Sequence, residues 1–134
     1  MTLTKDGFYR GWKNSPRYQK LFDSYNKKYF DGRLPDIKVG VAPLLKITYL
    51  SQKSLSKPEK IDGGEYGLAG TDPTDGTPYI VLDKGMTVFH VLMAKLTLIH
   101  EMVHHWIGLE KGHGKAFKTQ IRRLANLGAF DRLI

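Results

Sequence analysis

The chain has 134 residues, a mass of 15.2 kDa and a formal net charge of +8 at pH 7, a length typical of one domain. Hydrophobic residues make up 41% of the chain and charged residues 25%, so a folded core is expected rather than disorder. There is no cysteine, which excludes disulfides, cysteine nucleophiles and zinc sites built on thiolates.

The first element expected is a helix that begins at Ser15-Pro16. Residues 1–14 show no clear period and are taken as a lead-in segment to a domain spanning 15–134. Serine is a favoured N-cap and proline is favoured at the first helical position. Apolar residues follow at helical spacing, and Gly32 is placed to end the helix.

Strands are expected in the middle of the chain. Residues 37–41 alternate apolar and other side chains as a half-buried strand does, and a second short strand is expected at 47–50. A lysine-bearing loop at 51–64 follows. The β-rich runs at 65–70 and 79–82 flank the turn sequence TDPTDGTP, and together they predict a hairpin.

Helical periodicity returns at 87–107, and a last helix is expected from 115 to 127. The apolar residues of the long helix that fall in one stripe, and that we expect to be buried against the sheet, are Phe89, Leu92, Leu96, Ile99, Val103 and Ile107. The order of helix, strands, long helix and short helix predicts an α+β domain with a small, mostly antiparallel sheet.

The long helix carries an HExxH motif formed by His100, Glu101 and His104. Side chains four residues apart project from the same face, so both imidazoles can reach one ion at the zinc–nitrogen distance of about 2.0–2.1 Å. Glu101 can reach a zinc-bound water, whose pKa the ion lowers to about 7, and take its proton as a general base. The motif therefore predicts amide hydrolysis. The alternative is a pair of hydrogen-bonded or solvent-edge histidines around a surface glutamate.

A catalytic zinc needs a third protein ligand, and His113 is the better of two candidates downstream. Gly108 can turn the chain out of the helix, and Gly112 and Gly114 let the backbone pass close to the ion. Glu110 is expected to be a solvated charge, and His90 and His105 are not expected to bind metal. A loop histidine with no metal partner is the alternative for His113.

The segment 96–118 (LTLIHEMVHHWIGLEKGHGKAFK) resembles the active-site region of the SprT-like zinc metallopeptidases, a family that includes the Spartan and bacterial SprT types. In that family a histidine in a His-Gly context follows HExxH, with an aromatic residue soon after, and His113-Gly114 and Phe117 fit this pattern. The stretches 21–39 and 67–83 are similar to the family's opening helix with its first strand and to the strand pair before the catalytic helix.

The resemblance implies a zincin-like fold with one catalytic Zn²⁺ held by His100, His104 and His113, and with Glu101 as the general base. It also implies a protein or peptide substrate and action on proteins associated with or crosslinked to DNA. Many family members carry a C-terminal cysteine zinc ribbon. This chain resembles a minimal form without one, so any DNA contact is expected to come from the catalytic domain itself.

Four cations, Lys111, Lys115, Lys118 and Arg122, are expected on one face of the last helix and predict contacts with nucleic-acid phosphates. A solvated helix face is the alternative. Two other functions stay open: a basic nucleic-acid-binding domain with structural zinc or none, and a general small metallopeptidase with no DNA role.

The location expected from the sequence is inside the cell. No apolar run follows the first basic residues, and the most apolar stretch, 88–107, contains a lysine, a glutamate and several histidines. We therefore expect neither a signal peptide nor a membrane span, no membrane partner and no secretion. The expected state is a monomer that is cytoplasmic or nucleoid-associated, or in the host cytoplasm if the source is viral.

Overall fold

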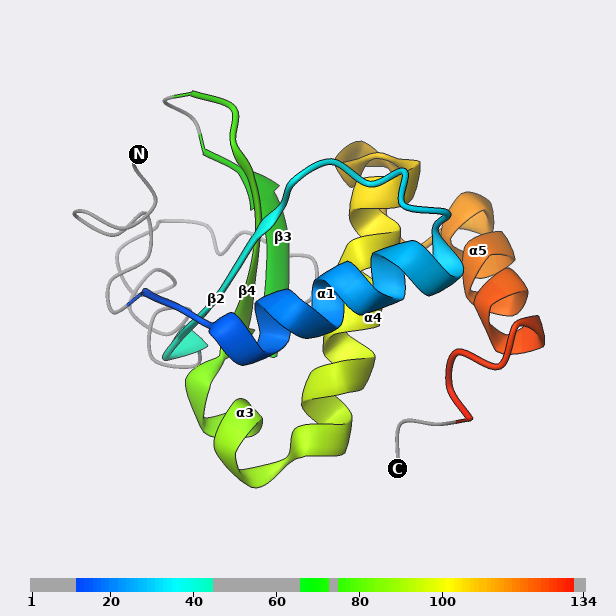
Figure 1. The fold of residues 1–134 in the computed structure, drawn as a ribbon. Coiled ribbons are helices and arrows are strands. Elements are labelled where there is room, and N and C mark those ends of the chain that lie inside the picture. Colours follow the sequence, from blue (N-terminus) through cyan, green and yellow to red (C-terminus); the bar gives the residue numbers. More distant parts are fainter. Residues whose placement is uncertain (1–11, 45–65, 73–74, 132–134) are drawn as a thin grey trace.

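The computed structural model describes residues 12–44, 66–72 and 75–131, which form the expected α+β fold (Figure 1). The strands are β1 (Lys13–Asn14), β2 (Lys38–Ala42), β3 (Gly67–Thr71) and β4 (Pro78–Asp83). The helices are α1 (Pro16–Tyr29), α3 (Lys84–Phe89), α4 (Val91–Ile107), the 3-10 helix η1 (Leu109–Lys111) and α5 (Lys115–Asn126). The strand expected at 47–50 and the loop expected at 51–64 lie outside these ranges. No helix within them is long and apolar enough to cross a bilayer.

The sheet is mixed, with the strand order β1-β2-β4-β3. Strands β3 and β4 pair antiparallel, with Gly67 opposite Leu82 and Thr71 opposite Pro78, which confirms the predicted hairpin. Strands β2 and β4 run parallel, and β1 pairs antiparallel with β2. The two outer pairings are therefore antiparallel around a parallel centre, and β4 is an interior strand.

The end of the segment 1–14 takes part in the fold. Lys13 and Asn14 form β1 and pair with β2. The buried indole ring of Trp12 packs on Gly40 so closely that a Cβ atom there would clash with it. Glycine at position 40 therefore makes room for the tryptophan against the sheet.

Helix α1 begins and is anchored through polar side chains. Ser15 caps it, since its Oγ accepts a hydrogen bond from Tyr18 N at 3.3 Å, and Pro16 occupies the first turn, as expected. Gln19 bridges to the chain entering β2, because its Nε2 donates to Ile37 O and its Oε1 accepts from Val39 N, both at 2.9 Å. The side-chain amide of Gln19 thus makes the two backbone hydrogen bonds that a neighbouring strand would make, and it fixes α1 along the edge of the sheet.

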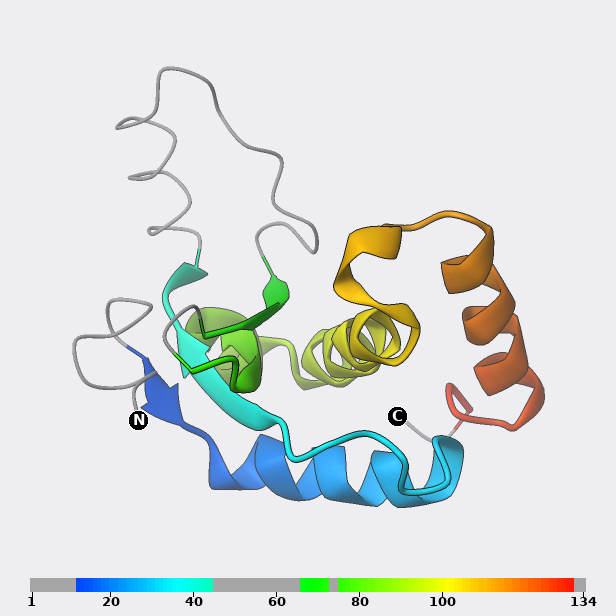
Figure 2. The ribbon, with the colours of Figure 1, turned by 90° about the horizontal axis from the view of Figure 1, so that it is seen from above.

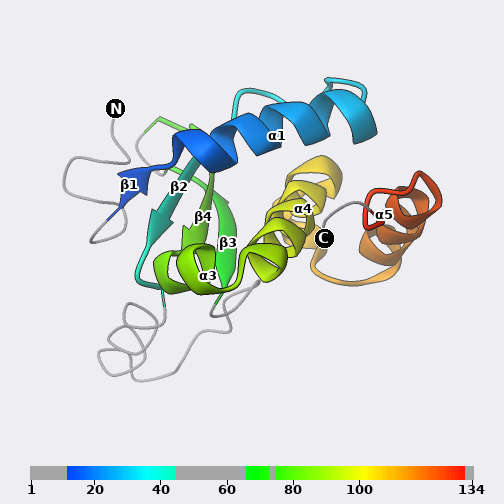
Figure 3. The same ribbon diagram turned by 60° about the horizontal axis from the view of Figure 1, so that its bottom comes forward.

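Two apolar clusters lie on opposite faces of the sheet. The larger joins α1, α4 and α5 to Val39, Ile80 and Leu82, and the smaller surrounds Trp12 and Tyr79. Figures 2 and 3 show α4 lying between the sheet and α5, with α1 running across them. This arrangement gives α4 a buried environment along much of its length.

The expectation of one continuous helix from 87 to 107 is wrong in its first part. Asp83 caps a separate helix, α3, by accepting from Met86 N at 3.0 Å, and the chain changes direction at His90 before α4 starts. The predicted buried stripe of apolar residues spans this break, so the prediction is wrong at its beginning. There Phe89 is 78% exposed and Leu92 is 43% exposed. Further along α4 the prediction holds, with Ile99 and Val103 buried.

Candidate metal centre

Helix α4 carries three of the candidate site residues, and it packs against both the sheet and α5. His100 and His104 lie one helical turn apart, and their Nε2 atoms are 3.2 Å from each other. His104 is 2% exposed, whereas the His100 side chain is 33% exposed. One edge of the histidine pair is thus buried in the core and the other faces solvent.

The third histidine returns to this pair through a glycine-controlled turn. Gly108 ends α4 with φ +108°, η1 follows, and Gly112 has φ +61° and ψ −145°. The second combination is one that essentially only glycine adopts. The chain therefore reverses, and His113 Nε2 lies 3.0 Å from His100 Nε2 and 3.1 Å from His104 Nε2.

The three nitrogens fit a single transition-metal ion. Two ligands at 2.0–2.1 Å from a tetrahedral zinc lie about 3.3–3.4 Å apart, close to the separations of 3.0–3.2 Å seen here. Among the described residues these imidazoles form the group of histidine, cysteine and carboxylate side chains close enough to hold a metal. Three imidazoles without a thiolate suit zinc, copper, iron or nickel, so the donor set alone does not choose the metal.

A fourth ring completes the cluster. The Phe117 centroid lies 4.8 Å from that of His100 and 4.9 Å from those of His104 and His113, and the three imidazoles are themselves 4.8–4.9 Å apart. Phe117 is 8% exposed on the first turns of α5. The sequence singles out Phe117 only as part of a resemblance; its spacing of four residues from His113 was the available signal that it shares the site.

Glu101 is buried beside the histidines. Its side chain is 1% exposed, and its Oε2 lies 3.9 Å from His100 Nε2. The alternative of a surface glutamate is therefore wrong. At this distance, the Glu101 carboxylate can hydrogen-bond to a small molecule that lies beside the Nε2 atoms of the histidines.

The other histidines lie apart from the cluster. His105 Nε2 donates to Tyr79 O at 2.8 Å, which joins α4 to β4. Burial lowers the pKa of His105, although the hydrogen bond to Tyr79 acts in the opposite direction. His90 is exposed at the break between α3 and α4, and Glu110 is exposed on η1. None of the three belongs to the group that could hold a metal.

The four cations of the predicted basic stripe lie on both sides of His113 in the sequence. Lys115, Lys118 and Arg122 lie on α5, as expected. The expectation that Lys111 lies on the same helix is wrong, because Lys111 ends η1, before the chain turns at Gly112. All four are exposed, and within the described ranges none of them forms an ion pair with a carboxylate. The four cations are thus near His113 in the sequence, and their side chains are exposed to solvent.

Comparison with known proteins identified a family match. The profile of the SprT-like family matches residues 18–132, which is nearly the whole chain. The match includes α1 from its third residue, the described strands from β2 onward, the histidine cluster and α5. No curated protein and no solved structure matched the chain.

Proposed function

The chain belongs to the SprT-like family, and we propose that it is a zinc-dependent endopeptidase. His100, His104 and His113 would hold the ion, and Glu101 would be the general base. The observation that carries this proposal is the convergence of three imidazole Nε2 atoms within 3.2 Å of one another beside a buried carboxylate.

The residues of the chain divide the chemistry between them. A zinc ion held by the three imidazoles would supply a Lewis acid that makes an attacking water more acidic. Glu101 then accepts a proton from the attacking water as the new C–O bond forms. The same carboxyl group delivers that proton to the amide nitrogen as the C–N bond breaks. Burial of Glu101 keeps bulk water from competing for this proton.

Strand β3 offers a place for the substrate backbone. It ends the described sheet, since it pairs with β4 on one side and with no other described strand. It also packs on α4, because a Cβ atom at Gly67 would lie 2.6 Å from Thr97 Cγ2. Thr97 is one turn before Glu101 on the helix. An extended peptide that adds to the β3 edge would therefore pass close to the catalytic carboxylate.

We propose further that substrates include DNA-associated or DNA-crosslinked proteins, with Lys111, Lys115, Lys118 and Arg122 contacting phosphates. Three observations support this proposal: the four cations are exposed, they form no ion pair with any carboxylate that the structure describes, and the net charge is +8. Each phosphate contact releases counterions, so binding through this stripe would weaken steeply with salt.

The test combines metal content with hydrolysis. Elemental mass spectrometry of the purified chain should give one zinc per chain, lost in His104→Ala and kept in His90→Ala, which removes an exposed histidine outside the cluster. Glu101→Gln should keep the zinc and lower the rate of cleavage of an unfolded protein by at least about 10²-fold.

The outcomes separate the candidate functions. Zinc without any hydrolysis in the unmodified chain, with salt-dependent DNA binding, would identify a binding domain instead of a peptidase. Hydrolysis that DNA does not stimulate, and that quadruple glutamine substitution of the basic stripe leaves unchanged, would identify a peptidase with no DNA role. Full activity in Glu101→Gln with zinc bound would overturn the assignment of the base.

A further inference from the structure

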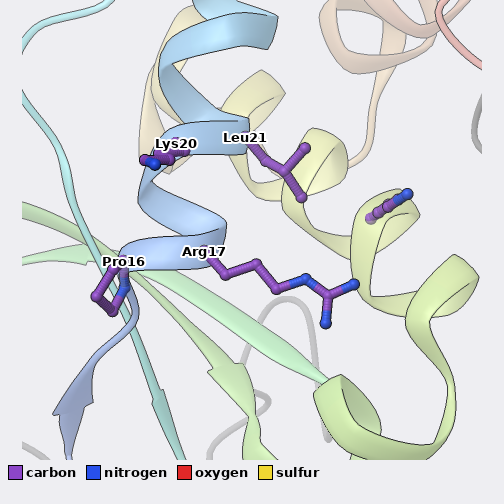
Figure 4. A pocket seen from close by; sticks show the side chains of 5 residues that line it. Pro16, Arg17, Lys20 and Leu21 are labelled. Carbon is purple, nitrogen blue, oxygen red and sulfur yellow. The ribbon is translucent and has the colours of Figure 1, made fainter.

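A second site is indicated on the opposite side of α4 from the metal cluster. A cleft of about 470 Å³ opens between α1 and α4, and the described residues that line it are Pro16, Arg17, Lys20, Leu21 and Lys95. Figure 4 shows Arg17 and Leu21 extending from α1 toward α4. Lys95 is nine residues before His104, which is about two and a half helical turns, so it points away from the buried histidine. The cleft shares no residue with the metal cluster.

All the charged residues among those that line this cleft are cations. Arg17, Lys20 and Lys95 have no carboxylate within 4.0 Å in the described part of the chain. Lys95 is half-buried, so solvent screens its charge less than that of a fully exposed lysine. Three cations around one cleft repel each other, and a bound anion would offset that repulsion.

The start of α1 adds to the same positive field. Pro16, which lines the cleft, is in the first turn of this 14-residue helix, and that turn contains no acidic side chain. The amino end of a helix carries a partial positive charge that favours anions. The helix end therefore reinforces the three side chains.

We propose that this cleft binds the terminal phosphate of an organic ligand. A carboxylate brings one negative charge, whereas a phosphate monoester brings about −1.5 to −2 near pH 7, which matches three cations better. Arginine can hold two phosphate oxygens at once while lysine acts as a point charge. The volume exceeds that of a bare phosphate, and Pro16 and Leu21 supply apolar wall for the rest of the ligand. This site does not depend on peptidase activity.

The experiment uses phenyl phosphate as the probe and the full chain as the receptor. Binding is followed by backbone amide chemical shifts, which also report where the probe binds. Shifts should concentrate at residues 17–21 and 95. The double variant Lys20→Gln with Lys95→Gln should weaken binding by about tenfold or more. The control, Lys27→Gln with Lys28→Gln, removes the same charge from the other end of α1 and should change the affinity by less than about twofold.

Other results would overturn the proposal. Equal weakening by both double variants would show attraction to net charge alone, and benzoate binding as tightly as phenyl phosphate would remove the assignment to phosphate. Two single-stranded oligonucleotides, alike except for a 5′-phosphate or a 5′-hydroxyl, then distinguish the source. A preference for the 5′-phosphate that is lost in the cleft variant assigns a nucleic-acid end. Equal binding of the two, with phenyl phosphate still bound in the cleft, assigns a small phosphorylated molecule.

Discussion

The rings of Phe117 and His104 lie with their centroids 4.9 Å apart and their planes inclined by 32°. His104 is 2% exposed and Phe117 8% exposed, so the two rings pack inside the domain. The Phe117 ring centroid also lies 4.8 Å from that of His100 and 4.9 Å from that of His113, so one side chain of α5 contacts all three imidazoles and restricts their rotation. We infer that Phe117 is a positioning residue for the metal cluster.

Replacing Phe117 should weaken metal binding without removing a ligand. Phe117→Ala is expected to lower zinc affinity by about tenfold, since freed imidazoles lose preorganisation, and to cost about 3 kcal/mol of stability through the cavity it leaves. Phe117→Leu fills most of the space and should keep both within a few-fold of the original. Affinity is measured by competition with a chromogenic chelator, at a temperature where circular dichroism shows each variant folded. Unchanged affinity in folded Phe117→Ala would refute the positioning role.

Gly112 and Gly114 flank His113 but should respond differently to alanine. Gly112 has φ +61° and ψ −145°, while Gly114 has φ −78° and ψ −151°. Gly112→Ala is therefore expected to cost about 1–3 kcal/mol of backbone strain and to displace His113, which lowers zinc affinity. Gly114→Ala should leave both quantities nearly unchanged, because a Cβ atom there meets nothing closer than Lys111 O at 4.0 Å. Chemical denaturation and the chelator competition check both variants; equal effects would contradict this reasoning.

The buried carboxylate of Asp83 should be a main determinant of stability. It accepts hydrogen bonds from Leu44 N at 3.1 Å and from Met86 N at 3.0 Å. Asp83→Ala leaves two backbone donors without this partner and is expected to cost about 2–4 kcal/mol. Asp75→Ala is the control, because Asp75 accepts from Thr77 N in an exposed turn, where the expected cost is below about 1 kcal/mol. Urea denaturation at neutral pH measures both.

Tyr18 should make the domain sensitive to alkaline pH. Burial raises the pKa of Tyr18, and the neighbouring Arg17 offsets part of that rise. The unfolded chain therefore releases the phenol proton first as the pH passes about 10, and stability falls from there upward.

Tyr18→Phe removes this contribution, so its unfolding free energy should decline less between pH 9 and pH 11, as followed by denaturation at about five pH values. The buried hydroxyl has no hydrogen-bond partner among the described residues, so at pH 7 the variant should be as stable as the original chain or more stable by about 1 kcal/mol. A marked loss of stability at pH 7 would show that the hydroxyl is hydrogen-bonded after all.

Local signals in the sequence predicted most of the fold. The Ser15-Pro16 start of α1, the hairpin of β3 and β4, and the helical period of α4 depend on neighbouring residues, which a sequence displays directly. The sequence analysis did not anticipate a separate α3, although its cap, in which Asp83 accepts from Met86 N, is local. The second bond of that carboxylate, from Leu44 N, is a distant contact that the sequence does not display. Gln19 was unremarkable for the same reason, since its partners Ile37 and Val39 belong to a later segment.

The metal cluster was easier to predict than its surroundings. The i, i+4 spacing of His100 and His104 follows from helix geometry alone, and Gly108 and Gly112 indicate the turn that brings His113 back. The burial of Glu101 and the contact of Phe117 with all three imidazoles depend on how α5 packs against α4, which no local pattern specifies. The cleft at Lys95 likewise depends on the crossing of α1 and α4.

The route of the chain through the histidine cluster has a consequence for the last helix. His100 and His104 belong to α4, whereas His113 lies beyond the turn that leads into α5. A shared ion would therefore close a short loop and act as a reversible cross-link between two helices. Chelation should release the segment from Gly108 onward into faster hydrogen exchange and proteolysis, while α1 stays held by Gln19. Metal binding and the packing of α5 against α4 would then be coupled, so that each favours the other.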